Sequence, residues 1–199
     1  EIVRRLVGSE MCIRDSVLKG PTGSGKTLLL RVLAGLENPD HGKVFFQERD
    51  QNQWKMPEYR TQVALLPQRP AFQEGSVEQN WRMPFDFRER SNQHYDSSRF
   101  KPWLEMLELP TDFARKQTSE LSGGERQLAA LLRMLQFDPH LLLLDEPASA
   151  LDESKSKKME ELLNDWQKQV PGRTWIWVSH DSRQAERVGD EVLELGAVS

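Results

Sequence analysis

The stretch GPTGSGKT, Gly20 to Thr27, indicates the fold class of this 199-residue chain. Apolar Val17 and Leu18 precede it, and the helix-forming run LLLRVLAGL follows it. A strand, a glycine-rich turn closed by Lys and Thr, and a helix in this order are typical of a phosphate-binding loop. A glycine-rich turn without function is the alternative, and the flanking strand and helix disfavour it. We therefore expect an α/β fold with a parallel sheet, in which Lys26 faces the β- and γ-phosphates of a nucleotide and the Thr27 hydroxyl binds magnesium.

A second stretch, LLLLDEP from Leu141 to Pro147, predicts a buried strand that ends in two carboxylates. Ligands of open α/β sheets bind at the carboxyl ends of the strands, which is where these carboxylates would lie. Asp145 is the expected second magnesium ligand, opposite Thr27. Glu146 points to the other side and can accept a proton from an attacking water. The alternative is that both carboxylates only cap the turn before Pro147.

A third stretch, LSGGERQ from Leu121 to Gln127, predicts the start of a helix. The apolar residues that follow it fall on one helical face: Leu128, Leu131, Leu132 and Leu135. Such a start offers free backbone N–H groups and a positive dipole to an anion. We therefore expect Ser122, Gly123 and Gly124 to bind phosphate.

Together these motifs resemble the ATP-binding subunits of ABC transporters, from about Val17 to Leu195, and LSGGERQ is similar to the signature of that family. The resemblance implies three further site residues. Gln68 in VALLPQRP resembles the lid glutamine that links the magnesium site to the helical subdomain. Asp152 in SALD resembles the aspartate that contacts the opposite subunit, and His180 after TWIWVS resembles the switch histidine at the γ-phosphate.

The resemblance also implies a P-loop ATPase core with an inserted helical subdomain, and a homodimer that encloses two ATP molecules with Mg²⁺. A separate integral membrane permease would be the partner, which places the chain at the cytoplasmic face of the membrane. The expected catalytic residues are Glu146, His180 and Gln68, and the expected metal ligands are Thr27, Gln68 and Asp145. The expected nucleotide contacts are Gly20, Pro21, Thr22, Gly23, Ser24, Gly25, Lys26, Thr27, Ser122, Gly123, Gly124 and Asp152.

Three phrases between the motifs resemble the ATPase subunits of bacterial iron-export systems. These phrases are RMLQFDPHLLLLDEP at residues 133–147, SALDESKSK at 149–157 and MPFDFRER at 83–90. Iron export is therefore one expectation. A soluble ABC-type ATPase that acts on nucleic acid or ribosomes is the alternative, although the chain shows no long coiled coil, zinc ligands or tandem ATPase units. A small-molecule kinase would share the phosphate loop but would not need LSGGERQ or the histidine.

Composition narrows the function classes. A net charge of −4 without long basic runs argues against nucleic acid as the main partner. The single cysteine, Cys12, excludes an internal disulfide. No apolar run approaches the roughly 20 residues that span a bilayer, so we expect no direct membrane insertion.

The chain divides into an α/β core and a helical insert. The core uses residues 17 to about 68 and 140–195, with strands expected at 44–47, 63–66, 141–144 and 174–178. The insert covers about 76–137, with helices expected at 77–82, 100–107 and 125–135. Residues 154–168 predict an amphipathic helix of the core region, and Asp181 predicts the cap of another helix.

Two features depart from the family pattern or stay open. The chain has no Phe, Trp or Tyr before Phe45 that could stack on adenine, so we expect weak ATP binding. Residues 1–16 contain VGSEMCIRDS, which resembles translated sequencing-adaptor read-through and is expected to be foreign. Trp81 and Phe85 either line an exposed groove for a permease helix or pack inside the insert.

Overall fold

The computed structural model describes residues 15–87 and 94–196, which form two compact units. Each unit is built from segments that are not contiguous in the sequence. Unit 1 comprises Glu1–Pro67, Pro139–Pro147 and Val170–Ser199, and unit 2 comprises Gln68–Asp138 and Ala148–Gln169.

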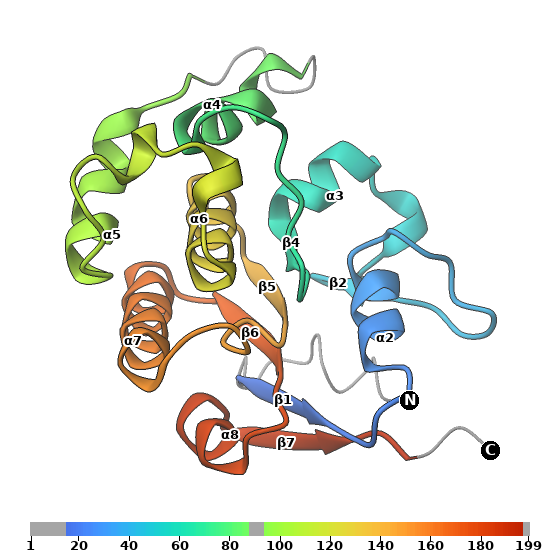
Figure 1. Cartoon of the computed structure of the whole chain (residues 1–199). Coiled ribbons are helices and arrows are strands. Elements are labelled where there is room, and N and C mark those ends of the chain that lie inside the picture. The colour runs from blue at the N-terminus through green and yellow to red at the C-terminus, as the bar shows by residue number, and fades with distance from the viewer. Residues whose placement is uncertain (1–14, 88–93, 197–199) are drawn as a thin grey trace. The chain divides into compact units, whose positions relative to one another are not determined.

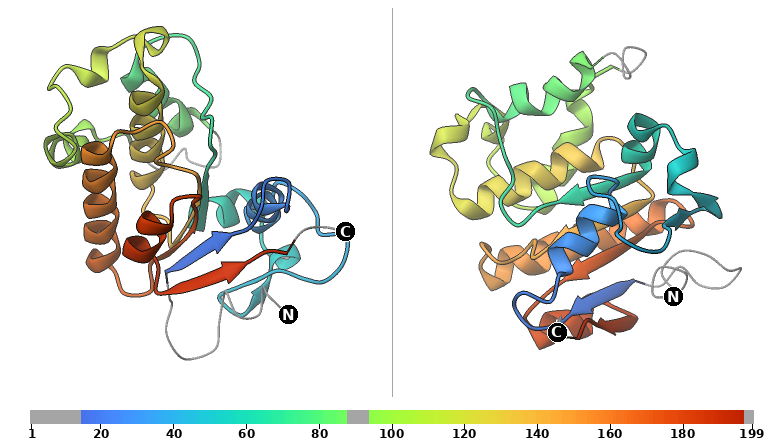
Figure 2. Two further views of the ribbon diagram at one scale, coloured as in Figure 1. Left: turned by 60° about the horizontal axis from the view of Figure 1, so that its bottom comes forward. Right: turned by 90° about the vertical axis from the view of Figure 1, so that its right-hand side faces the viewer.

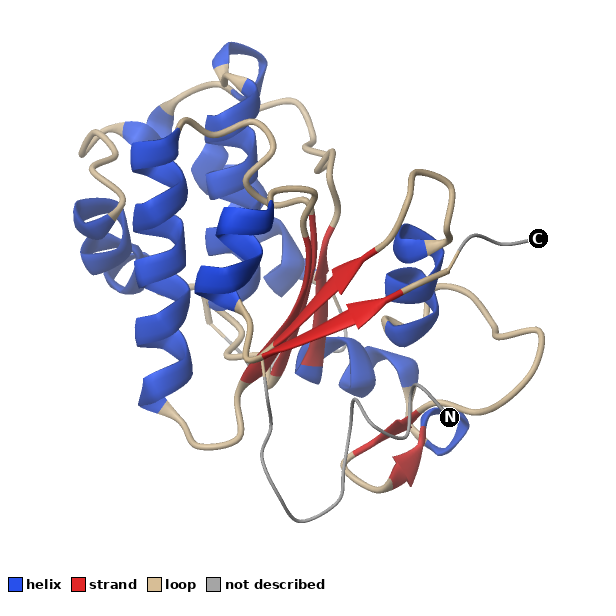
Figure 3. Ribbon diagram, turned by 90° about the horizontal axis from the view of Figure 1, so that it is seen from below, coloured by secondary structure: helices blue, strands red, loops and turns tan. Residues whose placement is uncertain are grey.

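Unit 1 contains a five-stranded sheet with the order β4-β5-β6-β1-β7, in which all neighbouring strands are parallel (Figures 2 and 3). Burial on both faces of a parallel sheet explains why β5 is an unbroken apolar run, with all of its residues buried. The strands are β1 Ser16–Lys19, β4 Val63–Leu66, β5 Leu141–Asp145, β6 Thr174–Val178 and β7 Glu191–Glu194. The predicted α/β fold with a parallel sheet is confirmed.

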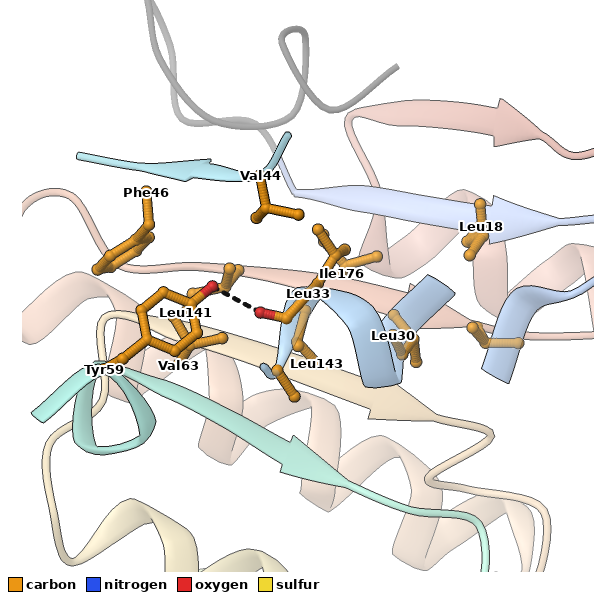
Figure 4. Packing of buried hydrophobic residues seen from close by; sticks show 12 residues of the cluster. Leu18, Leu30, Leu33, Val44, Phe46, Tyr59, Val63, Leu141, Leu143 and Ile176 are labelled. Carbon is orange, nitrogen blue, oxygen red and sulfur yellow. Dashed lines mark hydrogen bonds between the residues drawn. The ribbon is translucent and has the colours of Figure 1, made fainter. Parts of the chain in front are cut away.

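Among the described residues, three α-helices belong to unit 1, and one of them packs against the sheet at β4 and β5. This helix, α2 Lys26–Leu33, packs Leu30 and Leu33 into a core with Leu18 and Leu143 (Figure 4). The helix α3 Met56–Gln62 adds Tyr59, whose hydroxyl donates to the carbonyl oxygen of Leu33 at 2.6 Å, so that the buried phenol is satisfied. The third helix is α8 Ser182–Val188.

The strand expected at 44–47 exists but lies outside the main sheet. Instead β2 Phe45–Phe46 pairs antiparallel with β3 Arg49–Asp50 in a two-stranded sheet, followed by the 3₁₀ helix η1 Gln51–Gln53. The turn residues Gln47 and Glu48 have φ values of 49° and 61°, as a two-residue hairpin turn requires. A hairpin pairs the strand with its immediate neighbour, which apolar content alone does not reveal.

Unit 2 is helical, and its described residues include no strand apart from an isolated bridge between Ser76 and Gln117 (Figure 1). Its α-helices are α4 Val77–Arg82, α5 Phe100–Met106, α6 Gly123–Leu135 and α7 Glu153–Gln169. Its 3₁₀ helices are η2 Met83–Asp86, η4 Ser97–Arg99, η5 Phe113–Arg115 and η6 Thr118–Glu120. The structure thus groups α7 with the helices of the insert, whereas the sequence analysis assigned it to the core.

Trp81 packs inside unit 2, and the small part of it that stays accessible borders a pocket of that unit. It is 1% exposed, stacks on Phe100 at 4.1 Å between ring centroids, and donates its indole N–H to Ala129 O at 2.8 Å. Phe85 is half-buried against Phe137. Of the two interpretations, packing is the correct one for Trp81.

At the start of the described chain, Asp15 and Ser16 are part of the sheet. The carbonyl oxygen of Asp15 accepts from the N–H groups of Asp190 and Glu191, and Ser16 is paired with β6 and β7. The rest of the segment expected to be foreign, residues 1–14, lies outside the described residues. Within the described ranges, no helix has both the length and the apolar character needed to cross a bilayer.

Candidate functional site

The turn between β1 and α2 is a loop whose backbone conformation depends on glycine. Gly23 and Gly25 have φ values of 84° and 85°, a region that side chains with a Cβ rarely adopt. A Cβ on either residue would meet nothing within 4 Å, so backbone conformation and not crowding requires glycine there. Gly25 is also the N-cap of α2 and provides no side-chain acceptor, which leaves the first N–H groups of the helix for an anion.

Gly20 is required for a different reason, because a Cβ there would lie 2.7 Å from both Leu195 O and Ser24 Oγ. Between these glycines, Pro21 and Thr22 are exposed at the tip of the loop.

Lys26 is buried and already oriented by the loop itself. Its Nζ donates to the carbonyl oxygens of Gly20 and Pro21, both at 2.9 Å. An ammonium group has three protons, so one stays available to a phosphate oxygen. Ser24 Oγ is buried without a hydrogen-bond partner among the described residues, and such an orphaned hydroxyl suits a phosphate oxygen. The loop therefore fits the phosphates of a nucleotide.

The two expected magnesium ligands of unit 1 are in contact. The Thr27 hydroxyl donates to Asp145 Oδ2 at 2.9 Å, which joins the start of α2 to the end of β5. Burial raises the pKa of Asp145, the hydrogen bond from Thr27 opposes this rise, and the nearby charge of Glu146 adds to it. A bound divalent cation would offset the negative charges of Asp145 and Glu146 at this partly buried position. Hydroxyl and carboxylate oxygens are suitable ligands for Mg²⁺.

Thr27 and Asp145 would provide only part of the coordination shell of a magnesium ion. The described residues contain no group of three or more His, Cys, Asp or Glu side chains that could hold a metal ion. Mg²⁺ commonly combines one or two protein ligands with phosphate oxygens and water, and Thr27 with Asp145 match that use.

Glu146 and His180 form a pair at the ends of adjacent strands. His180 Nε2 lies 3.0 Å from Glu146 Oε1, and the Glu146 N–H donates to Val178 O at 3.2 Å. Glu146 has a φ of 48°, which turns the chain sharply after β5. The parallel pairing of β5 with β6 brings the two side chains together. The sequence analysis expected each residue at the γ-phosphate but not their contact with one another.

In unit 2, the LSGGERQ motif forms the beginning of α6 through a capping box. Ser122 Oγ accepts from the Glu125 N–H at 3.2 Å, and Glu125 Oε2 accepts from the Ser122 N–H at 2.9 Å. Ser122 and Gly123 are exposed. Gly124 is buried, and a Cβ there would lie 2.8 Å from Ala150 O. The start of α6 therefore packs on the loop that leads to Asp152.

Asp152 is exposed and forms the start of α7, where its Oδ1 accepts from the Lys155 N–H at 2.9 Å. Gln68 is exposed and is the first residue of unit 2, two residues after β4. The structure thus gathers the phosphate loop, Asp145, Glu146 and His180 within unit 1. It gathers Ser122, Gly123 and Gly124 with the loop before Asp152 within unit 2.

The chain is similar in sequence to ATP-binding proteins of transport systems. A profile of the ABC transporter family matches residues 14–149. The probable iron export ATP-binding protein FetA of Escherichia coli (strain K12) is 36% identical over 90% of this chain and 77% of that protein. The sulfate/thiosulfate import ATP-binding protein CysA of Synechococcus elongatus is 36% identical over 89% of this chain, which spans only 51% of that relative.

A solved structure agrees with these relatives. The dimeric post-hydrolysis state of the ATP-binding cassette MJ0796, bound to ADP and Pi, has a TM-score of 0.78 and 25% identity over 94% of this chain and 84% of that one. The chain belongs to the ABC transporter family, and it is an ATP-binding subunit that hydrolyses ATP.

Proposed function

We propose that this subunit drives a separate integral membrane permease from the cytoplasmic face of the membrane, as one half of a homodimer that encloses two ATP molecules. The observation that carries the proposal is the contact between Thr27 and Asp145 beside the pair of Glu146 and His180. This arrangement places the proposed Mg²⁺ ligands, Thr27 and Asp145, next to a carboxylate and an imidazole at one edge of the sheet.

The residues of unit 1 have distinct tasks in this proposal. The N–H groups at the start of α2, the third proton of Lys26 and the Ser24 hydroxyl bind the phosphates of ATP. Lys26 has two acceptors within the loop, and Ser24 Oγ has no hydrogen-bond partner among the described residues. Thr27 and Asp145 hold Mg²⁺, with Gln68 as a further ligand. When bound, the ion neutralises charge on the β- and γ-phosphates.

Glu146 is the general base that accepts a proton from the attacking water. His180 orients Glu146 through the 3.0 Å contact and reaches the γ-phosphate. Neighbouring strand ends suit this division of tasks because they hold both side chains rigidly.

The second half of each site comes from the opposite subunit. Ser122, Gly123 and Gly124 present exposed N–H groups at the start of α6, and Asp152 lies on the loop against which that start packs. A two-fold dimer would bring these groups to the γ-phosphate of the partner's ATP and form two equivalent sites. ATP binding would close the dimer, and hydrolysis would let it open. The dimeric state of the cassette MJ0796 supports this arrangement.

For the transported substrate we propose a metal, with iron export as the specific case. The E. coli protein named for probable iron export is matched over 77% of its length, whereas the matched sulfate and polyamine import proteins are spanned over about half. Purification of the chain from membranes together with a permease would test the partner. Recovery without any membrane protein would favour a soluble ABC-type ATPase.

A mixing experiment tests the composite site. Lys26→Ala removes the phosphate contact of one half, and Ser122→Arg blocks the other half with a bulky cation. Each variant alone should be inactive. In an equal mixture, half of the dimers carry both lesions in one site and leave the other site intact, so about a quarter of the wild-type ATPase activity should return. An inactive mixture would show that the sites are not shared between subunits.

A further inference from the structure

The segment that follows Gln68 is fastened to the signature helix α6 by a phenylalanine and two arginines. The Phe72 ring has Arg133 Cζ at 4.8 Å from its centroid and Arg126 Cζ at 5.9 Å. Both arginines lie on α6 about two turns apart, which places them on the same face of that helix. Both distances fall within the range of cation–π attraction. We call Phe72, Arg126 and Arg133 the clamp.

Hydrogen bonds extend the clamp along the backbone on both sides of the ring. Arg133 Nη2 donates to Ala71 O at 3.1 Å. Arg126 Nη2 donates to Thr118 O at 2.5 Å, and Thr118 Oγ1 donates in turn to Gln73 O at 3.0 Å. The segment from 71 to 73 is therefore held at successive points and cannot shift without breaking contacts to α6 or to the chain just before it.

Further contacts of unit 2 reach Ser122 in the signature. Lys116 Nζ donates to Glu125 Oε1 at 2.7 Å, and the other oxygen of Glu125 accepts from the Ser122 N–H. Lys116 O also accepts from the Val77 N–H at 3.0 Å, which fixes the start of α4. Every contact in this chain of interactions lies within unit 2.

The positive charge of Arg133 contributes to the clamp in addition to the packing of its side chain. Arg133 is half-buried, and burial lowers the pKa of its guanidinium. Among the described residues, no carboxylate forms an ion pair with it. The ring face of Phe72 and the carbonyl of Ala71 are the groups that offer negative potential to this cation.

We propose that Phe72, through its contacts with Arg126 and Arg133, is a positioning residue that makes the segment after Gln68 and the signature helix move as one body. This inference rests on the proposed function, in which Gln68 belongs to one nucleotide site and Ser122 to the site of the partner. The clamp then converts a displacement of Gln68 into a displacement of Ser122. It acts on dimer closure and turnover, and it leaves ATP binding to the single subunit unchanged.

The test compares substitutions that keep or remove the aromatic face. Phe72→Leu keeps an apolar side chain of similar reach but removes the ring, whereas Phe72→Tyr keeps the ring, and the half-buried position lets the added hydroxyl reach water. Both are made in the Glu146→Gln background, and ATP-dependent dimerisation is measured by analytical ultracentrifugation. Phe72→Leu should weaken the dimer about tenfold, and Phe72→Tyr should restore it to within about twofold.

Phe87→Leu is the matched control, because Phe87 is 56% exposed in the same unit and makes no ring contact with other described residues. It should dimerise like the Glu146→Gln parent, and all variants should bind ATP as single subunits with the parent's Kd. If Phe72→Leu dimerises like the parent, or if Leu and Tyr weaken the dimer equally, the clamp does not act through the ring and the inference is wrong.

Hydrogen exchange in the single subunit separates this inference from the proposed function. The Thr118 N–H donates to Gly75 O at 2.9 Å, so Phe72→Leu should speed its exchange about tenfold, with no change in α7. Unchanged exchange would overturn the clamp itself. If the Glu146→Gln parent fails to dimerise with ATP while exchange responds as expected, the clamp exists but the proposed dimer is wrong, and the coupling role falls with it.

Discussion

The close packing of Gly124 on the loop at Ala150 gives a prediction whose magnitude follows from the structure. A Cβ at Gly124 would lie 2.8 Å from Ala150 O and 2.9 Å from Leu151 Cδ2. The adjacent Gly123 is a matched control, because its Cβ would meet only Ala150 Cβ at 3.4 Å, an ordinary contact. Both residues open the same helix, so an alanine gains a similar helix propensity at either position.

Gly124→Ala forces a backbone oxygen to move by about half an ångström, and such overpacking costs about 1–3 kcal/mol. Helix propensity returns up to about 1 kcal/mol, which leaves a net loss of about 0–2 kcal/mol. Gly123→Ala should be neutral or stabilise by up to about 1 kcal/mol. The propensity gain is the same in both variants, so thermal unfolding followed by circular dichroism should separate them by the overpacking cost alone, about 2–12 °C.

A second substitution sharpens the test. Leu151→Ala in the Gly124→Ala background removes one of the two close contacts but not the carbonyl, so it should relieve part of the strain caused by the added Cβ. The double variant should be more stable than the sum of the two single effects. Equal melting temperatures for Gly123→Ala and Gly124→Ala would refute the reasoning, because they would show that the loop yields without cost.

Three further predictions concern the active site and the signature. Glu146→Gln should lower ATP turnover at least about 100-fold while ATP binding persists, since the amide keeps the shape but cannot accept the proton; phosphate release at the wild-type rate would remove Glu146 as the base. Lys26→Ala should abolish binding and turnover together, and isothermal titration with unchanged affinity would contradict its phosphate contact. Burial acts to raise the pKa of Glu125, but hydrogen bonds from Lys116 and Ser122 outweigh it, so that the pKa lies below the ordinary 4.5. The stability that these bonds add is complete above pH 4.5 and is lost as pH falls through the lowered pKa, so the wild type should exceed Glu125→Gln by about 1 kcal/mol at pH 7 and by less at pH 3. A gap of the same size at both pH values would argue against ionised Glu125 as its source.

Much of the fold follows from local patterns in the sequence. The glycine loop between β1 and α2 could be predicted because its residue types and spacing are specific, and the leucine run of β5 because only a strand covered on both faces accepts it. The strand β7 carries only Val192 and Leu193 between acidic residues, and its place beside β1 comes from tertiary pairing. The helix α3 has a proline in its first turn and few apolar residues, so its periodicity is weak.

In the candidate site, too, the residues could be predicted from local motifs, but the contacts between them could not. Each expected residue of unit 1 could be named from its motif, but the contact of Glu146 with His180 depends on which strands are neighbours in the sheet. The clamp could not be predicted, because Phe72 and Arg133 are distant in the sequence and neither belongs to a spaced motif. Long-range contacts of this kind leave no local pattern.

The two carbonyl oxygens that accept from Lys26 also bear on the thermodynamics of nucleotide capture. Ordering a free lysine side chain costs up to about 2 kcal/mol of conformational entropy, and here that loss occurs when the chain folds. An incoming triphosphate therefore meets a cation whose position is already fixed by two carbonyl oxygens of the loop. Calorimetry should accordingly find a small heat-capacity change on binding, in contrast to loops that fold around their ligand. A loop organised in this way can release ADP and take up fresh ATP without having to refold in every cycle.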